Sequence, residues 1–309
     1  HSNLVRNVLS AAPRIPVQQD DLALEFLPLC HVFERMLGYL YMYAAADKAY
    51  CSVYHVGDLV SQIKPTVFAG VPRFYEKVYD KIMDKVNHAP PVRRALFNWA
   101  VGKGRNAYPE VLAGRKPGGF GYGLADKLVL SKVREGLGGR VRFCISGGAP
   151  LPSFVNEFFH SIGVRILEGY GLTETSPVVG VNGAEPGMTR IGTIGKAIDG
   201  VEVKVAADGE LCVRGPNVMS GYWNLPEKTA EVFDDDVKVV RILVCQCSQA
   251  LTDVIEYRCD SIFLKLIFKL IAFDLDRLYG LTSDIFKLDK MVSKLCLNNP
   301  TDGALLHLE

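Results

Sequence analysis

The sequence lacks an excess of charge of either sign. Its 309 residues contain 35 Lys and Arg against 34 Asp and Glu, which gives a formal net charge of +1. The basic residues are also spread along the chain, so the composition gives no electrostatic argument for nucleic acid as a partner. We therefore expect recognition of a charged ligand to depend on a few local residues.

The sequence also lacks a long hydrophobic run. The longest one, SIFLKLIFKLIAF at 261–273, is short and carries two lysines, which argues against a membrane-spanning helix. No basic-then-apolar leader opens the chain, and we expect a cytoplasmic protein. The chain opens without an initiator Met, directly in a predicted helix, so we expect it to be cut from a longer protein.

Cysteine is present, but not in the patterns that hold disulfide frameworks or zinc. The only close pair among the eight cysteines is Cys245 and Cys247, and no paired CxxC motif occurs. We expect reduced, mostly buried thiols, as in a cytosolic protein. No Ser-His-Asp order or pair of carboxylates suggests a hydrolytic site.

Repeated strand-and-helix units fill most of the chain. Short apolar segments are followed by apolar residues at three- and four-residue spacing, which predicts a strand and then a helix. These units span residues 23–45, 49–65 and 66–86, and the pattern resumes at 125–171. The pattern predicts an α/β fold with parallel sheets flanked by helices, in which ligands bind at the carboxyl ends of the strands.

Two segments depart from this rhythm. Residues 88–124 are rich in Pro and Gly, and we expect an exposed excursion with a short helix around Leu96 to Val101. After residue 190 the apolar period becomes two, with a hairpin signal at Asp208-Gly209. We predict an α/β core at 1–190, the start of a β-rich subdomain at 191–236 and an unassigned extension at 237–309.

Two glycine-rich strand exits, SGGAPLP at 146–152 and EGYGLTETSP at 168–177, are candidates for chemistry. Glycine lets the backbone approach a ligand closely, so adjacent exits can form a slot for a planar group on which Tyr170 stacks. Thr173 offers a hydroxyl for a phosphoryl oxygen, and Glu174 offers the hard oxygen ligand that Mg²⁺ prefers. The simpler alternative is a tight Gly-Tyr-Gly turn, a capping Thr and a solvated Glu.

Other candidates have simpler structural explanations. His31 follows a predicted strand, where a packed or hydrogen-bonded histidine is commoner than a substrate ligand. The apolar rows of the first helices are expected in the core, with a substrate tunnel as the minority hypothesis. These rows are Tyr39, Tyr41, Met42 and Tyr43, and Phe68, Val71, Phe74 and Tyr75.

Six ordered segments resemble motifs of the adenylate-forming superfamily, specifically its bacterial-type long-chain fatty acid–CoA ligases. They are EFLPLCHVFER, KPTVFAGVPRFYEKVYDKI, RFCISGGAPLP, EGYGLTETSPVV, IGTIGKAIDGVEVKV and GELCVRGPNVMSGYWNLPEKTAEVF. The resemblance covers residues 1–236, and residues 237–309 resemble nothing in the family. It implies the central part of the family's large domain, followed by the start of its small β subdomain.

The resemblance implies a two-step reaction with ATP, Mg²⁺ and coenzyme A. ATP and a fatty acid give acyl-adenylate and pyrophosphate, and coenzyme A then displaces AMP. The motif positions imply that Thr173 contacts the α-phosphate, that Glu174 holds Mg²⁺ and that His31 lies beside the carboxylate and the acyl entrance. By the same positions, Gly147, Gly148, Ala149 and Pro150 line one face of the adenine, Gly169, Tyr170 and Gly171 line the other, and Val71, Pro72 and Gly171 flank the acyl chain.

The departures from the family pattern are equally informative. The Ser/Thr/Gly-rich phosphate loop, the Thr-Gly-Asp segment and the C-terminal domain with its catalytic lysine are not in this chain. We expect a ligase fragment with weak nucleotide binding and poor turnover, whose extension comes from a shifted frame or a misjoined gene model. The alternatives are a non-catalytic nucleotide- and acyl-binding remnant, a non-functional product, or a fragment of an aryl- or amino-acid-adenylating enzyme. Peripheral membrane contact and the oligomeric state stay open.

Overall fold

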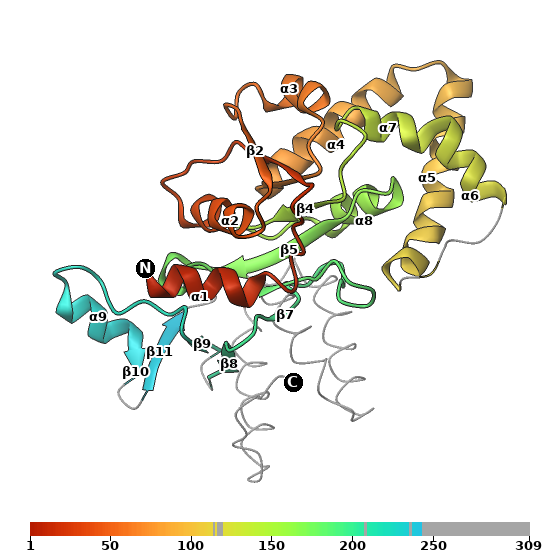
Figure 1. Cartoon of the computed structure of the whole chain (residues 1–309). Coiled ribbons are helices and arrows are strands. Elements are labelled where there is room, and N and C mark those ends of the chain that lie inside the picture. The colour runs from red at the N-terminus through yellow and green to blue at the C-terminus, as the bar shows by residue number, and fades with distance from the viewer. Residues whose placement is uncertain (114, 116–119, 207–208, 235–236, 243–309) are drawn as a thin grey trace, which may run out of the picture.

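A mainly parallel sheet forms the centre of the molecule (Figure 1). The computed structural model describes residues 1–242 except 114, 116–119, 207–208 and 235–236. Its larger sheet has seven strands in the order β2-β1-β3-β4-β5-β6-β7. The strands are β1 (Leu22–Glu25), β2 (Asp47–Tyr50), β3 (Val67–Gly70), β4 (Phe143–Ser146), β5 (Ile166–Gly171), β6 (Val178–Val181) and β7 (Lys196–Ala197). Strands β1 to β5 pair in parallel, and the β5–β6 and β6–β7 pairs are antiparallel.

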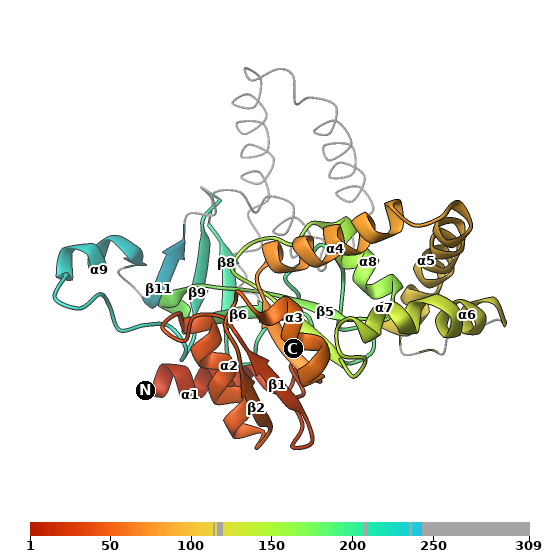
Figure 2. The same ribbon diagram turned by 90° about the horizontal axis from the view of Figure 1, so that it is seen from above.

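Helices cover both faces of this sheet, which confirms the predicted α/β fold (Figures 1 and 2). The main ones are α1 (Ser2–Ala11), α2 (Val32–Tyr43), α3 (Val56–Ile63), α4 (Pro72–Asn87), α5 (Pro91–Leu112) and α8 (Ser153–Ser161). Shorter segments are α6 (Phe120–Ala125), a π-helical turn at Asp126–Leu130, α7 (Ser131–Glu135), a 3₁₀ turn at Thr173–Thr175 and α9 (Pro226–Val232).

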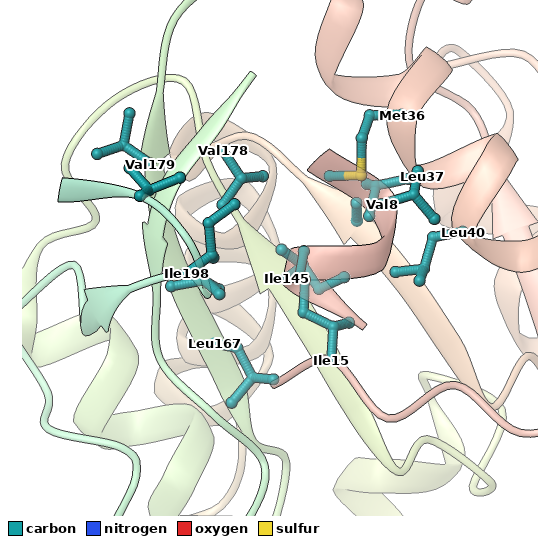
Figure 3. Packing of buried hydrophobic residues seen from close by; sticks show 14 of the residues in the cluster. Val8, Ile15, Met36, Leu37, Leu40, Ile145, Leu167, Val178, Val179 and Ile198 are labelled. Carbon is teal, nitrogen blue, oxygen red and sulfur yellow. The ribbon is translucent and has the colours of Figure 1, made fainter. Parts of the chain in front are cut away.

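The strands contribute side chains to two separate hydrophobic cores, one on each face of the sheet, because successive residues of a strand point to opposite faces. Ala23, Val67 and Ile145 pack with α1 and α2 in the first core. Leu24 and Phe68 pack with α3, α4, α5 and α8 in the second. Figure 3 shows the first core, in which side chains from α1 and α2 lie with residues of β4, β5 and β6.

The prediction for residues 88–124 was wrong in two respects. Helix α5 runs over 22 residues, far longer than predicted, and it packs against α8 instead of standing free. Its Ala100 is fully buried, and a methyl group on Gly104 would overlap the carbonyl oxygen of Ser161. Pro90 is the N-cap of α5 and Pro91 its first residue, where a missing N–H is tolerated. The Pro-rich sequence therefore marks the start of a helix and not a loop.

A smaller antiparallel sheet follows the larger one. Its strand order is β10-β11-β9-β8, with β8 at Glu202–Val205, β9 at Leu211–Arg214, β10 at Phe233–Asp234 and β11 at Val237–Ile242. The pairing of β8 with β9 confirms the hairpin predicted at Asp208-Gly209, although Asp208 itself lies outside the described residues. The β9–β11 pairing extends this sheet beyond residue 236. Residues 243–309, which make up most of the predicted extension, lie outside the described part.

Four residues that were expected in the core lie at the surface. Tyr39, Met42 and Tyr43 are 40%, 63% and 62% exposed, whereas Tyr41 is buried. The residues of one helical turn point in all directions, so only the position on the face toward the sheet is buried. Val71 is also exposed, at 38%.

The structure describes part of the cysteines that were expected to be mostly buried, and it also bears on the question of a membrane-spanning helix. Cys144 and Cys212 are buried, Cys51 is half-buried, and Cys30 is exposed, so the expected burial holds for only part of the described cysteines. Within the described residues, no helix is long and apolar enough to cross a membrane.

Candidate functional site

The predicted site residues follow three neighbouring parallel strands at the same edge of the sheet. Gly70 of β3 pairs with Ser146 of β4, and Ser146 pairs with Glu168 of β5. The next residues are Val71 and Gly147, which leave the sheet, and Gly169, which continues β5 in its pairing with β6. This is the carboxyl edge, where ligands bind in open α/β sheets.

The first glycine exit packs against the start of α2. A methyl group on Gly147 would lie 3.0 Å from Cζ of Phe33, so this glycine lets the ring approach the strand end. Gly148 has a φ of 85°, and a methyl group there would lie 3.9 Å from Cγ1 of Val71. Gly148, Ala149 and Pro150 are exposed, which leaves this turn open to a ligand.

The second glycine segment belongs to strand β5 and not to a tight turn. A methyl group on Gly171 would overlap the carbonyl oxygen of Pro177, so the close approach of the chain to itself requires this glycine. Gly169 lies against Val181, with 3.3 Å from the added methyl to Cγ2. Tyr170 pairs with Gly180 of β6 and is half-buried, so part of its side chain faces solvent.

The turn after β5 carries Thr173 and Glu174. It is a 3₁₀ turn in which the buried Thr175 hydroxyl donates to the carbonyl of Pro177 and accepts from the N–H of Leu172 at 3.0 Å. Thr175, which the sequence did not mark, thus shapes the turn. Thr173 is exposed and Glu174 is half-buried, so both can meet a ligand.

The loop between β9 and α9 forms two hydrogen bonds to this turn. The hydroxyl of Tyr222 donates to Oε1 of Glu174 at 2.8 Å, and the N–H of Met219 donates to the Glu174 carbonyl at 2.8 Å. The hydrogen bond to Glu174, partial burial and the Glu174 charge raise the pKa of Tyr222. Neither contact has a sequence signal, because the residues lie more than 40 positions apart.

Two buried asparagines tie three distant segments together. Nδ2 of Asn7 on α1 donates to the Val178 carbonyl at 2.8 Å, and Nδ2 of Asn217 donates to the Thr175 carbonyl at 2.9 Å. Val178 returns a hydrogen bond from its N–H to Oδ1 of Asn7 at 3.2 Å. These contacts fix the turn relative to α1 and the smaller sheet.

His31 is the N-cap of helix α2. Its Nδ1 accepts a hydrogen bond from the N–H of Phe33 at 3.2 Å, and the residue is exposed. Phe33 in turn contacts Gly147, so His31 stands near the first glycine exit. After β3, the exposed Val71 is the N-cap of α4 and the buried Pro72 is its first residue.

Two buried carboxylates lie at the two ends of the loop 26–31, which joins β1 to α2. Glu25 ends β1 and Glu34 lies in the first turn of α2, and each is 2% exposed. Burial, and then the Glu25 charge, raise the pKa of Glu34 to about 8. The backbone N–H groups of Leu27 and Phe26 donate hydrogen bonds to its carboxylate, and these bonds lower the pKa in part. Glu34 therefore holds the segment that leads from β1 toward His31.

The turn fits the magnesium ion implied by the resemblance. Among the described residues, no three His, Cys, Asp or Glu side chains gather as an all-protein metal site. Mg²⁺ bound with nucleotide needs only one or two carboxylates, because phosphate oxygens and water supply its other ligands. A single oriented Glu174 beside the hydroxyl of Thr173 meets that requirement.

Comparisons with known proteins agree on one family. The model of the AMP-binding enzyme family matches residues 1–223. Long chain acyl-CoA synthetase 7, peroxisomal, of Arabidopsis thaliana is 34% identical over 76% of this chain and 35% of its own length. The putative fatty-acid–CoA ligase fadD11 of Mycobacterium tuberculosis is 37% identical over 76% of this chain and 42% of its own.

A solved structure shows the same fold. The N-terminal domain of FACL13 from Mycobacterium tuberculosis superposes with a TM-score of 0.52 at 19% identity, covering 78% of this chain and 52% of that chain. The chain thus spans only 35% to 42% of the length of the two curated relatives it matches.

Proposed function

The chain belongs to the AMP-binding enzyme family, and from this premise we propose that it is the central part of a long-chain fatty acid–CoA ligase. The names of the relatives that are 34% and 37% identical support this substrate class. In this proposal residues 1–190 are the α/β core, residues 191–236 begin a β-rich subdomain, and residues 237–309 are an extension. The partners are a fatty acid, ATP and coenzyme A.

The single observation that carries the proposal is the convergence at the strand ends. The exposed turn at Gly148 follows β4, the half-buried Tyr170 lies near the end of the neighbouring β5, and Glu174 stands on the turn after β5. Such an arrangement suits a planar base between two backbone segments, with its phosphates reaching the Thr173–Thr175 turn. Gly147, Ala149, Pro150, Gly169 and Gly171 complete the proposed adenine slot.

Charge recognition falls to two neighbouring side chains. Thr173 would hydrogen-bond an α-phosphate oxygen, and Glu174 would hold Mg²⁺. The bound metal would offset negative charge on the phosphates. His31, Val71, Pro72 and Gly171 would border the fatty acid, with the exposed imidazole beside its carboxylate.

The proposed reaction needs no protein nucleophile. A carboxylate oxygen of the fatty acid forms a bond to the α-phosphorus, and pyrophosphate leaves with the electrons of the broken P–O bond. The sulfur of coenzyme A, which loses its proton, then attacks the acyl carbonyl carbon, and AMP leaves. The chain's own residues contribute by binding and orienting the two substrates at one edge of the sheet.

The proposal includes weak nucleotide binding and slow turnover by this chain alone. The resemblance puts the phosphate loop and the catalytic lysine in parts of the family that this sequence does not contain. We also propose a cytoplasmic location, with transient contact to membranes in which the acyl substrate dissolves. Two-substrate binding without turnover would favour the binding-remnant hypothesis over the catalytic one.

The test is exchange of labelled pyrophosphate into ATP by the 309-residue chain. We expect exchange that depends on hexadecanoate, that is absent with benzoate or amino acids, and that Glu174→Ala abolishes. Glu185→Ala, which changes an exposed carboxylate outside the site, is the matched control. If the chain neither catalyses exchange nor binds a non-hydrolysable acyl-adenylate analogue, the proposal is wrong.

A further inference from the structure

The Tyr222–Glu174 contact joins the two sheets of the molecule at a functional side chain. Tyr222 lies between β9 and α9, and its phenol reaches back to the turn after β5. The distance between the phenol oxygen and Oε1 of Glu174 is 2.8 Å, which is within the range of a good hydrogen bond.

The backbone around both residues is also held in place. The N–H of Tyr222 donates to Oγ1 of Thr229 on α9 at 2.9 Å, which anchors the tyrosine to the next helix. On the other side, the N–H of Met219 donates to the Glu174 carbonyl at 2.8 Å. The contact between the two side chains is therefore made by two fixed backbones.

Only one oxygen of the Glu174 carboxylate is engaged. Within the described part of the chain, Oε2 has no hydrogen-bond partner, and no Lys or Arg forms an ion pair with Glu174. A phenol is a neutral donor, so it restricts rotation of the carboxylate without cancelling its charge, as a lysine would. The second oxygen keeps both its lone pairs and its negative charge for a cation.

We propose that Tyr222 is a positioning residue that orients Glu174 so that Oε2 faces the metal of a bound metal–nucleotide complex. The inference rests on the proposed function, because it takes Glu174 as the magnesium-binding carboxylate. Hydrogen bonds from surrounding groups to a ligating carboxylate hold it in the coordinating orientation, and their loss weakens metal binding. The loop between β9 and α9 thus becomes part of the nucleotide site without touching the nucleotide.

The test compares Mn²⁺ binding to the 309-residue chain and its variants by electron paramagnetic resonance, with a non-hydrolysable ATP analogue present. Tyr222→Phe keeps the ring and removes the hydroxyl, so we expect the Mn²⁺ dissociation constant to rise roughly tenfold with an unchanged melting temperature. Glu174→Gln should lose the site. Trp223→Phe, a change at the exposed neighbouring residue, should bind as the unaltered chain does.

Each outcome separates the inference from the proposed function. If Glu174→Gln loses the site while Tyr222→Phe binds normally, the positioning role is wrong and the proposed function stands. If the unaltered chain and Glu174→Gln do not differ, the proposed function fails and the inference fails with it.

A further variant separates this role from a merely structural one. Thr229→Val removes the backbone anchor of Tyr222 but not the phenol, so we expect it to lower the melting temperature more than Tyr222→Phe does and to weaken Mn²⁺ binding less. Mn²⁺ binding that is weakened as much by Thr229→Val as by Tyr222→Phe would overturn the positioning role.

Discussion

Glu34 on helix α2 lies beside Glu25 at the end of strand β1, and both carboxylates are buried. Within the described residues, both oxygens of Glu25 and one oxygen of Glu34 have no hydrogen-bond partner, and Nζ of Lys48 lies 3.8 Å from Oε1 of Glu25. Burial and then the Glu25 charge raise the pKa of Glu34 to about 8. At neutral pH the folded protein therefore holds a proton on Glu34 that the unfolded chain releases.

This relationship predicts that stability falls as the pH rises. The folded state binds more protons than the unfolded state between the unfolded pKa of 4.5 and the folded value of about 8, so the free energy of unfolding decreases across that window. Glu34→Gln cannot ionise, and its amide oxygen can still accept from the Phe26 and Leu27 N–H groups. We expect it to stabilise the protein at pH 7 by up to about 3 kcal/mol.

Urea unfolding at pH 5, 7 and 9 measures this effect. The difference between Glu34→Gln and the unaltered chain should grow with pH and level off above pH 8, whereas Glu185→Gln at the surface should show no trend. A difference that is the same at all three pH values would contradict a protonated Glu34.

The buried His160 should change the stability with pH in the opposite direction to Glu34, at lower pH. Burial lowers the pKa of His160 to about 4, because the charged imidazole would lose its hydration on the inside of α8, next to Tyr108. The unfolded state then binds more protons between about pH 4 and 6.5, so the contribution of His160 to stability rises with pH in this window and opposes that of Glu34. We expect the free energy of unfolding of the unaltered chain minus that of His160→Phe to rise between pH 4 and 6.5, whatever the effect of the variant on absolute stability. A difference that does not change with pH over this range would place the titrating group elsewhere.

Helix α5 offers a matched pair of glycines. A methyl group on Gly104 would overlap the Ser161 carbonyl oxygen, whereas a methyl group on Gly102 meets nothing within 4 Å. Gly104→Ala should therefore force α5 and α8 apart and cost about 1–3 kcal/mol. Gly102→Ala should stabilise the helix by up to about 1 kcal/mol. Opposite shifts in the melting temperature would confirm the α5–α8 contact, and equal shifts would contradict it.

The alternating strands and helices were predictable because each depends on neighbours within a few residues. The periods of two and 3.6 identified β1, α2, β3 and α4 from local sequence alone. The docking of α5 on α8 was not predictable, because the contact between Gly104 and Ser161 joins residues far apart in the chain. The surface position of Tyr39 and Tyr43 also depends on which side of α2 faces the sheet.

The candidate site divides in the same way. Each glycine exit carries a local motif signal, Glu174 belongs to the second motif, and the sheet register brings the two strands together. Tyr222 and Asn217 reach the turn from the smaller sheet, 48 and 42 positions away. No spacing rule links residues at such distances, so only the folded structure identifies them as supports of the site.

Two substitutions can separate the capping role of His31 from its proposed role at the substrate. Its Nδ1 caps α2 by accepting from the Phe33 N–H, which is a structural role, and we propose that its exposed ring borders the fatty acid. Asn is a good N-cap, whereas Ala at an N-cap position costs about 1 kcal/mol. We therefore expect His31→Ala to lower both stability and hexadecanoate binding, and His31→Asn to keep stability while weakening hexadecanoate binding. Thermal melting and binding of a fluorescent fatty acid measure the two effects, and full binding by His31→Asn would leave His31 with the capping role alone.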